Sequence, residues 1–236
     1  MSYDDAVTLH IDTAAAELDN ASPQAILRWA AHTFGDRLAV VTSFQNTGIV
    51  TLHMLQSIAP DTTVITLDTG LLFPETVQLI DRLEEEFNLN LIRARPGLSV
   101  EAQAEQYGDA LWSHNPDHCC QMRKVQPLEA ALRPFDAWVT GLRRDQSARR
   151  ANTPTIGRDK KRPNMIKIAP FATWTADMVD LYIQTFGLPY NPLYDQGYRS
   201  IGCWPCTQPV RPDDDPRAGR WRDSAKNECG IHTDET

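Results

Sequence analysis

The feature that most constrains the fold is a series of apolar runs, each of strand length and each ending at a polar turn. Helical patterns with one apolar face lie between several of these runs. Strands that alternate with helices form a mostly parallel sheet flanked by helices, so we predict the α/β class. The predicted strands are 37–42, 63–67, 89–93, 137–140 and 164–168, and the predicted helices include those near Pro23, Ile49, Pro74 and Thr175.

Three polar turns follow predicted strands directly, at 42–48, 67–70 and 141–150. In such sheets ligands bind beyond the carboxyl ends of the strands, so we expect the three turns to line one pocket. The first turn also leads into a helix, whose free backbone N–H groups favour an anion. It lacks the G-K-[ST] of a Walker loop, which excludes that kind of phosphate loop.

The chain of 236 residues suits a single α/β domain over 1–236. Within it, 1–36 read as a helical segment and 207–236 as a loop-rich tail that carries the catalytic cysteine. A formal net charge of −8 argues against a broad nucleic-acid surface. The sequence contains no membrane span and no secretory segment, so we expect a cytoplasmic protein. Homo-oligomerisation is left open.

The cysteines form two pairs and one single residue. The two pairs offer four soft ligands, enough for a zinc ion or an iron–sulfur cluster. We predict a helix that begins at the first pair and runs to Leu132, where adjacent side chains point about 100° apart. That arrangement suits a large cluster better than a compact ion, although spacing alone leaves both open. The single cysteine, near His232, remains for chemistry. The five are Cys119, Cys120, Cys203, Cys206 and Cys229.

Basic clusters are informative in an acidic chain. One group of arginines lies within 143–150, and a second comprises Arg217, Arg220 and Arg222. The planar fork of arginine suits phosphate and sulfate, so both groups predict an anion pocket. For the run 160–162 we expect a solvated loop instead.

Seven short motifs stand in the chain in this order: Thr42-Ser43-Phe44-Gln45, Leu67-Asp68-Thr69-Gly70, Cys119-Cys120, Gly141-Leu142-Arg143-Arg144-x-Gln146-Ser147, Cys203-x-x-Cys206, Arg217-x-Gly219-Arg220-Trp221 and Glu228-Cys229-Gly230-Ile231-His232. Together they closely resemble assimilatory adenylyl-sulfate (APS) reductase, of the phosphoadenylyl-sulfate (PAPS) reductase family. The resemblance runs from about residue 38 to the last residue, and the cysteine pattern with the terminal Glu-Cys-Gly-x-His is highly specific. The N-terminal helix carries none of it.

The resemblance implies an adenine-nucleotide α-hydrolase type of fold and thioredoxin-dependent reduction of adenosine 5′-phosphosulfate to sulfite and AMP. Cys229 would attack the sulfur and carry the sulfite as S-sulfocysteine. Thioredoxin or a related dithiol would then release it. His232 would bind or polarise the substrate, and Lys124 would link the cluster with the phosphosulfate.

The remaining roles also come from the resemblance. One [4Fe-4S] cluster per chain would be held by Cys119, Cys120, Cys203 and Cys206. The phosphosulfate would be held by Arg150, Arg217 and Arg220. The nucleotide would be contacted, partly through the backbone, by Thr42, Ser43, Leu67, Thr69 and Gly141. Relatives often have Ser-Phe-Gly-x-Glu in the first turn, where this chain has Ser43-Phe44-Gln45-Asn46-Thr47. The contacts of Gln45 and Thr47 therefore do not follow from the resemblance.

Three other functions are open to such a chain. A PAPS reductase shares the fold and the terminal cysteine, and Arg158 or Lys160 could meet a 3′-phosphate, but cluster-free PAPS reductases lack the four paired cysteines. A PP-loop ATP pyrophosphatase needs a Ser-Gly-Gly-x-Asp-Ser loop, which the turn after the first strand does not match. A cluster-bearing binding module would leave Cys229 and His232 unexplained.

Overall fold

A computed structural model describes residues 3–222, 224, 226 and 228–232, with side chains described from residue 11 onward. Its strands form one six-stranded sheet in the order β3-β2-β1-β4-β6-β5. All neighbouring strands are parallel except β5, which runs antiparallel to β6. The predicted mostly parallel sheet is confirmed. The strands are β1 (Leu38–Val41), β2 (Thr63–Leu67), β3 (Leu91–Ala94), β4 (Ala137–Thr140), β5 (Ile156–Arg158) and β6 (Ile166–Ile168).

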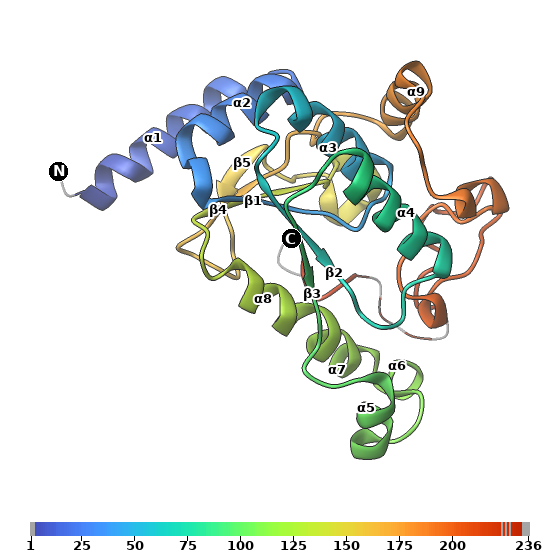
Figure 1. The fold of residues 1–236 in the computed structure, drawn as a ribbon. Coiled ribbons are helices and arrows are strands. Elements are labelled where there is room, and N and C mark those ends of the chain that lie inside the picture. The colour runs from blue at the N-terminus through green and yellow to red at the C-terminus, as the bar shows by residue number, and fades with distance from the viewer. Residues whose placement is uncertain (1–2, 223, 225, 227, 233–236) are drawn as a thin grey trace.

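Helices cover both faces of this sheet (Figure 1). Some of them begin at a capping side chain: Ser22 Oγ accepts the N–H of Ala25 at 3.3 Å ahead of α2, and Thr175 caps α9 in the same way. The helices are α1 (Tyr3–Leu18), α2 (Pro23–Phe34), α3 (Asn46–Ile58), α4 (Pro74–Glu86), α5 (Val100–Tyr107), α6 (Leu111–His114), α7 (Pro116–Cys120), α8 (Gln126–Leu132) and α9 (Ala176–Phe186), with short turns η1 (Gly35–Arg37), η3 (Arg144–Gln146), η4 (Ala148–Arg150), η5 (Pro192–Gln196) and η6 (Trp204–Cys206).

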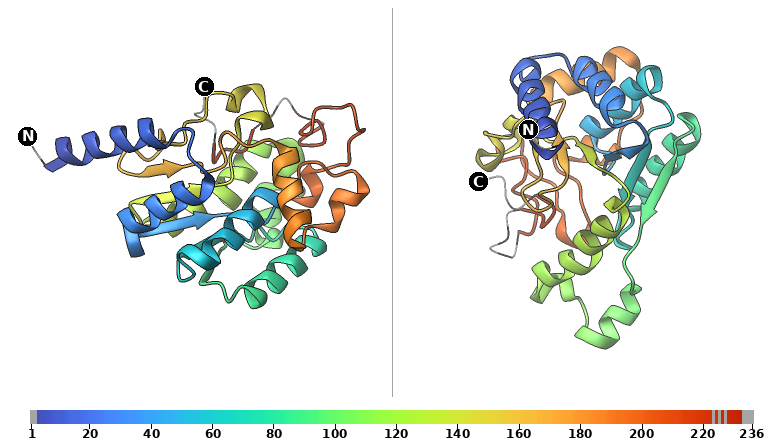
Figure 2. Two further views of the ribbon diagram at one scale, coloured as in Figure 1. Left: turned by 90° about the horizontal axis from the view of Figure 1, so that it is seen from above. Right: turned by 90° about the vertical axis from the view of Figure 1, so that its left-hand side faces the viewer.

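The two faces of the sheet have separate apolar cores because side chains alternate along each strand. On one face Val40 and Val139 pack with α2, α3, α4 and α9. On the other face the neighbouring residues Ala39 and Trp138 pack with α8, and Ile231 of the C-terminal tail packs against this second core. Figure 2 shows the resulting layers, with α1 extending away from the rest of the fold. No helix among the described residues is long and apolar enough to cross a bilayer.

The direction in which successive strands are added to the sheet reverses at β1. From β1 it proceeds to β2 and β3 on one side, whereas β4 lies on the other side of β1. Val40 thus sits between Val64 of β2 and Val139 of β4. A ligand site is expected beyond the carboxyl ends of the strands at this reversal.

The helix that carries the first cysteine pair differs from the prediction. It begins at Pro116, capped by Asn115, so Cys119 and Cys120 end a helical turn where we expected them to begin one. A π-helical turn, η2 (Gln121–Val125), then joins α7 to α8. Such turns insert an extra residue into the helix and recur at functional sites. Here the π turn contains Lys124.

Candidate active site

A cavity of about 360 Å³ lies beyond the carboxyl ends of β1, β2 and β4. The turns after all three strands line it, as the sequence predicted. The rest of its wall comes from the tail, the π turn, α9, η5 and the loop that leads into the second cysteine pair. The cavity brings together most of the residues singled out in the sequence, although their roles stay predictions: Thr42, Ser43, Leu67, Thr69, Lys124, Gly141, Arg150, Cys203, Arg217, Arg220, Cys229 and His232.

The turn after β1 is fixed by close contacts of its backbone. Thr42 Oγ1 accepts the N–H of Phe44 at 3.0 Å, and the buried Phe44 adopts a φ of +54°. A Cβ on Gly48 would stand 2.0 Å from Thr42 Oγ1, so glycine is required where α3 approaches this turn. The turn therefore holds the first residues of α3 against Thr42 at the cavity wall.

Gln45 and Thr47, whose contacts the sequence left undetermined, both connect the first turn to other segments. Gln45 Oε1 accepts the N–H of Ile201 at 3.1 Å, just before the second cysteine pair. Thr47 Oγ1 accepts from Arg143 Nη1 at 2.6 Å. Both side chains fasten loops around the cavity.

The second cysteine pair lies in a loop that is tied to the turn after β2. Cys203 forms an isolated bridge with Leu72, and its Sγ lies 3.3 Å from Thr69 Oγ1. Burial, and then the nearby Cys203 thiol, raises the pKa of Cys119 and brings the pKa of Cys206 to about 11. All five cysteines are free thiols. The pKa shifts mark Cys119, Cys203 and Cys206 as neighbours, although 83 or more residues separate the pairs in sequence.

The fifth cysteine contacts the first pair. The Cys120 thiol donates to Cys229, which raises the pKa of Cys120 and lowers that of Cys229. Lys124, the Ile231 N–H and Arg220 lower the pKa of Cys229 further, against the effect of burial. Burial disfavours the charge of Lys124, but Cys203, Cys229 and Cys120 outweigh it and raise the pKa of the ammonium. The lowered pKa favours the thiolate form of Cys229 beside the buried ammonium of Lys124.

The donor set fits an iron–sulfur cluster better than a single ion. Among the described residues, no three of the His, Cys, Asp and Glu side chains gather closely enough to bind one metal ion. A cluster bonds its cysteines at separate iron atoms, so its ligands lie further apart than the four around zinc. Three of the four paired thiols are buried beside Lys124, which would offset the negative charge of a thiolate-bound cluster.

Trp221 provides an aromatic surface for the cations of the cavity. It is buried and adopts a φ of +49°. The Arg220 guanidinium lies over its ring at 4.5 Å from the centroid, and Lys124 at 5.9 Å. Arg220 Nη1 donates to Ser200, but its Nε is buried and has no acceptor among the described residues. Arg220 also lines the cavity, so its guanidinium is near enough to pair with an anionic ligand there.

Glu228, the residue before Cys229, is the buried carboxylate of this cavity. It accepts from Arg150 Nη2 at 2.7 Å and from Arg217 Nη2 at 2.8 Å. Burial lowers the pKa of Arg217 to about 10, and Arg150 adds to this effect, whereas Glu228 opposes it. In the sequence, Glu228 is distinguished only as part of the terminal Glu-Cys-Gly-x-His motif. Only its position between a cysteine and an arginine-rich segment hinted at such pairing.

His232 lies flat against the core. Its ring stacks on Trp138 at 5.9 Å with 9° between the planes, and its Nδ1 lies 3.4 Å from Lys167 Nζ. Burial and the charges of Lys167, Arg150 and other arginines hold the pKa of His232 well below its usual range. The imidazole is therefore neutral near pH 7. With Nδ1 facing an ammonium, the ring proton belongs on Nε2.

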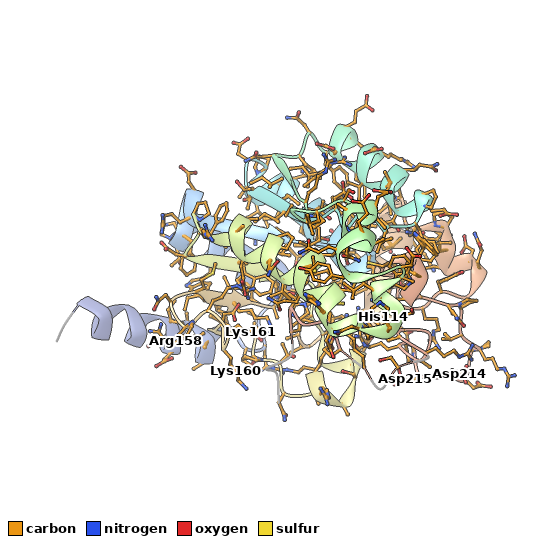
Figure 3. The ribbon with its side chains drawn as sticks, turned by 90° about the horizontal axis from the view of Figure 1, so that it is seen from below. His114, Arg158, Lys160, Lys161, Asp214 and Asp215 are labelled. Carbon is orange, nitrogen blue, oxygen red and sulfur yellow. The ribbon has the colours of Figure 1, made fainter. Side chains whose placement is uncertain are left out.

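A second cavity, of about 270 Å³, lies behind His232 and shares Ile231 and His232 with the first. The solvated-loop expectation for 160–162 is wrong for two of its residues. Lys161 Nζ donates to the Gly230 carbonyl, and Arg162 pairs with Asp159 at 3.0 Å. Only Lys160 is exposed as expected. Figure 3 shows Arg158, Lys160 and Lys161 on one flank, away from His114, Asp214 and Asp215.

Known proteins resemble the chain over most of its length. The sequence profile of the phosphoadenosine phosphosulfate reductase domain matches residues 37–209. A protein named adenosine 5′-phosphosulfate reductase from Salinibacter ruber is 50% identical over 92% of this chain and 86% of that protein. A phosphoadenosine 5′-phosphosulfate reductase from Gloeobacter violaceus is 44% identical over 94% and 93%. The crystal structure of a PAPS reductase from Candida auris, a phosphate complex, superposes with a TM-score of 0.75 at 33% identity, covering 89% of this chain and 98% of that one.

Proposed function

The chain belongs to the phosphoadenosine phosphosulfate reductase family, and from this premise we propose that it reduces adenosine 5′-phosphosulfate to sulfite and AMP. One observation carries the proposal. The cavity at the carboxyl ends of the strands contains Cys229, the only cysteine outside the two pairs, among the cations Lys124, Arg217 and Arg220. A soft nucleophile in a cationic, partly buried pocket fits attack on the sulfur of an anionic phosphosulfate.

In the first step the Cys229 thiolate attacks the sulfur. A bond forms between Sγ and sulfur, and the bond from sulfur to the bridging oxygen breaks, leaving its electron pair on AMP. Negative charge is present on nucleophile and leaving group alike, so fixed cations lower the barrier. Lys124 and Arg220 would supply this stabilisation, with Arg217 and Arg150 holding the phosphosulfate. His232, neutral with its proton on Nε2, would donate a hydrogen bond.

The nucleotide would lie along the turns that follow β1, β2 and β4. Thr42 and Ser43 come from the first turn, Leu67 and Thr69 from the second and Gly141 from the third. A nucleotide at this edge of an α/β sheet matches the general location of ligands in such folds.

In the second step a dithiol protein, such as thioredoxin, regenerates the enzyme. One of its thiolates attacks Sγ of S-sulfocysteine and expels sulfite, and its second thiol then reduces the mixed disulfide. The products are sulfite, free Cys229 and an oxidised dithiol, so the two electrons of the reaction come from the partner.

Cys119, Cys120, Cys203 and Cys206 would hold one [4Fe-4S] cluster per chain. When bound, the cluster would change the electrostatic potential next to the substrate anion. Lys124 would offset negative charge on the cluster ligands and on Cys229 alike, since its charge lowers the pKa of both Cys120 and Cys229.

PAPS reduction is the alternative, because relatives with that name are also similar over most of the chain. The four paired cysteines favour APS. Steady-state kinetics with APS and PAPS, each with thioredoxin and with sulfite as the measured product, would decide between them. We expect the larger kcat/KM for APS. Incubation with APS and no reductant should add one sulfite to Cys229, and a Cys229→Ser variant that still makes sulfite would refute the proposal.

A further inference from the structure

The Glu228 carboxylate joins the nucleophile's segment to the core at a buried point. Its Oε2 accepts from both Nε and Nη2 of Arg150, at 3.0 and 2.7 Å. Its Oε1 accepts from Arg217 Nη2 and from the backbone N–H of Cys229, both at 2.8 Å. Arg150 belongs to η4, after β4, whereas Arg217 and Glu228 belong to the tail. One carboxylate thus connects core, tail and nucleophile.

We propose that Glu228 is a positioning residue, whose carboxylate docks the tail on Arg150 and fixes the backbone of Cys229 for attack. The proposal rests on the proposed function for the identity of the reaction. It adds a residue that acts through Cys229 without touching the substrate. The side chains of Glu228 and Arg150 are only 5% and 7% exposed, so their pairing is shielded from solvent and salt.

The geometry favours a permanent clamp over a placeholder for the substrate anion. Arg150 presents one edge of its fork to Glu228, and its Nη1 donates to Gln146 Oε1 at 2.5 Å. Gln146 Oε1 also accepts the backbone N–H of Arg143 at 3.2 Å. Contacts within the segment after β4 therefore orient Arg150 toward Glu228. A carboxylate that merely filled the anion site would not also hold the N–H of the nucleophile.

Other contacts hold the same segment at or after Cys229. Lys161 Nζ donates to the Gly230 carbonyl, and His232 stacks on Trp138. The His232 N–H donates to the Cys229 carbonyl at 3.1 Å, whereas the Cys229 N–H is held by Glu228. A buried pair that loses one partner leaves the other charge uncompensated, so removal of the Glu228 charge should release the tail.

The test uses Glu228→Gln in the holoprotein, with Asp215→Asn as the matched control. Asp215 is a tail carboxylate that also touches Arg217, by accepting its backbone N–H at 2.7 Å, but it is exposed at the surface (Figure 3). Both substitutions remove one negative charge from the tail. Hydrogen–deuterium exchange of the peptide ending at His232 reports docking without substrate. Single-turnover addition of sulfite to Cys229 reports positioning.

We expect Glu228→Gln to raise the exchange rate of that peptide and slow sulfite transfer, each about tenfold, with KM changed less than threefold. Asp215→Asn should change neither. Arg150→Met should raise the exchange rate of that peptide as Glu228→Gln does, and the double variant should exchange no faster than either single one, because both remove the same pair. Exchange without substrate is the readout compared here, because the proposed function also gives Arg150 a contact with the phosphosulfate. If Arg150→Met fails to fold, Glu228→Gln, which leaves the core intact, still decides.

A Glu228→Gln variant that transfers sulfite faster, or with a lower KM, would show that the carboxylate competes with substrate and would overturn the proposal. So would unchanged exchange, or faster exchange with an unchanged transfer rate. The exchange measurement needs no turnover. Failure of the proposed function, seen as no sulfite adduct on the unsubstituted protein, is thereby distinguished from failure of the clamp.

Discussion

Replacement of Arg220 by methionine should separate activity from stability. Its Nε is buried without an acceptor in the described part of the chain, and its guanidinium packs over Trp221. Under the proposed function the Arg220 guanidinium would pair with the substrate anion, which would stabilise the bound state selectively. Loss of one such charged donor costs about 3 kcal/mol of transition-state stabilisation, or roughly 150-fold in rate. Methionine keeps an apolar contact with the Trp221 ring, so the fold should persist.

The assay is single-turnover sulfite transfer to Cys229, followed by mass spectrometry, beside thermal unfolding of the same samples. We expect the rate to fall roughly 150-fold while the free energy of unfolding changes by less than about 1 kcal/mol, because a buried unsatisfied N–H is removed. Arg220→Lys should be intermediate, since it keeps the charge and loses the fork. A transfer rate for Arg220→Met within threefold of the unsubstituted protein would refute the reasoning.

The remaining predictions concern the same cavity. Gly202→Ala should slow sulfite transfer about tenfold without unfolding the chain, because a Cβ at this position would stand 2.2 Å from Arg220 Nη2 and displace that flexible group. Transfer rates and thermal melting curves of the variant check this. Burial lowers the pKa of His232, so as the pH drops below about 6.5 the unfolded state takes up a proton before the folded state does, and the free energy of unfolding should fall. Chemical denaturation at pH 7.5 and 5.5 measures this fall, which should be smaller in His232→Gln. Anaerobically purified protein should contain about four iron and four sulfide per chain, and metal analysis that finds zinc alone would contradict the cluster.

The strands could be predicted where burial on both faces leaves an unbroken apolar run. All four residues of β4 are buried, and its observed bounds match the predicted ones, as do those of β2. β5 was missed because its three residues include Gly157 and the exposed Arg158. It pairs at the sheet edge, where charge is favoured and apolar patterning is lost.

Most residues singled out by the motifs line the cavity, but their pairing with one another could not be predicted. Arg150 and Glu228 are 78 residues apart, and no local pattern indicates that one fork meets one carboxylate. The contact of Lys161 with Gly230 was missed for the same reason, since a lysine run in a loop is usually solvated. Long-range contacts depend on how the tail crosses the folded core. The single-domain boundary of 1–236 stays a prediction.

The proposed nucleophile and the turns proposed to bind the nucleotide are far apart in the order in which the chain is made. The turns after β1, β2 and β4 are complete by residue 150, whereas Cys229 is added 79 residues later. A chain cut before Glu228, by a premature stop codon or by a protease, would keep the sheet and most of the nucleotide-facing wall but would have no thiol for the chemistry. Under the proposed function, such a fragment should bind the nucleotide without consuming it.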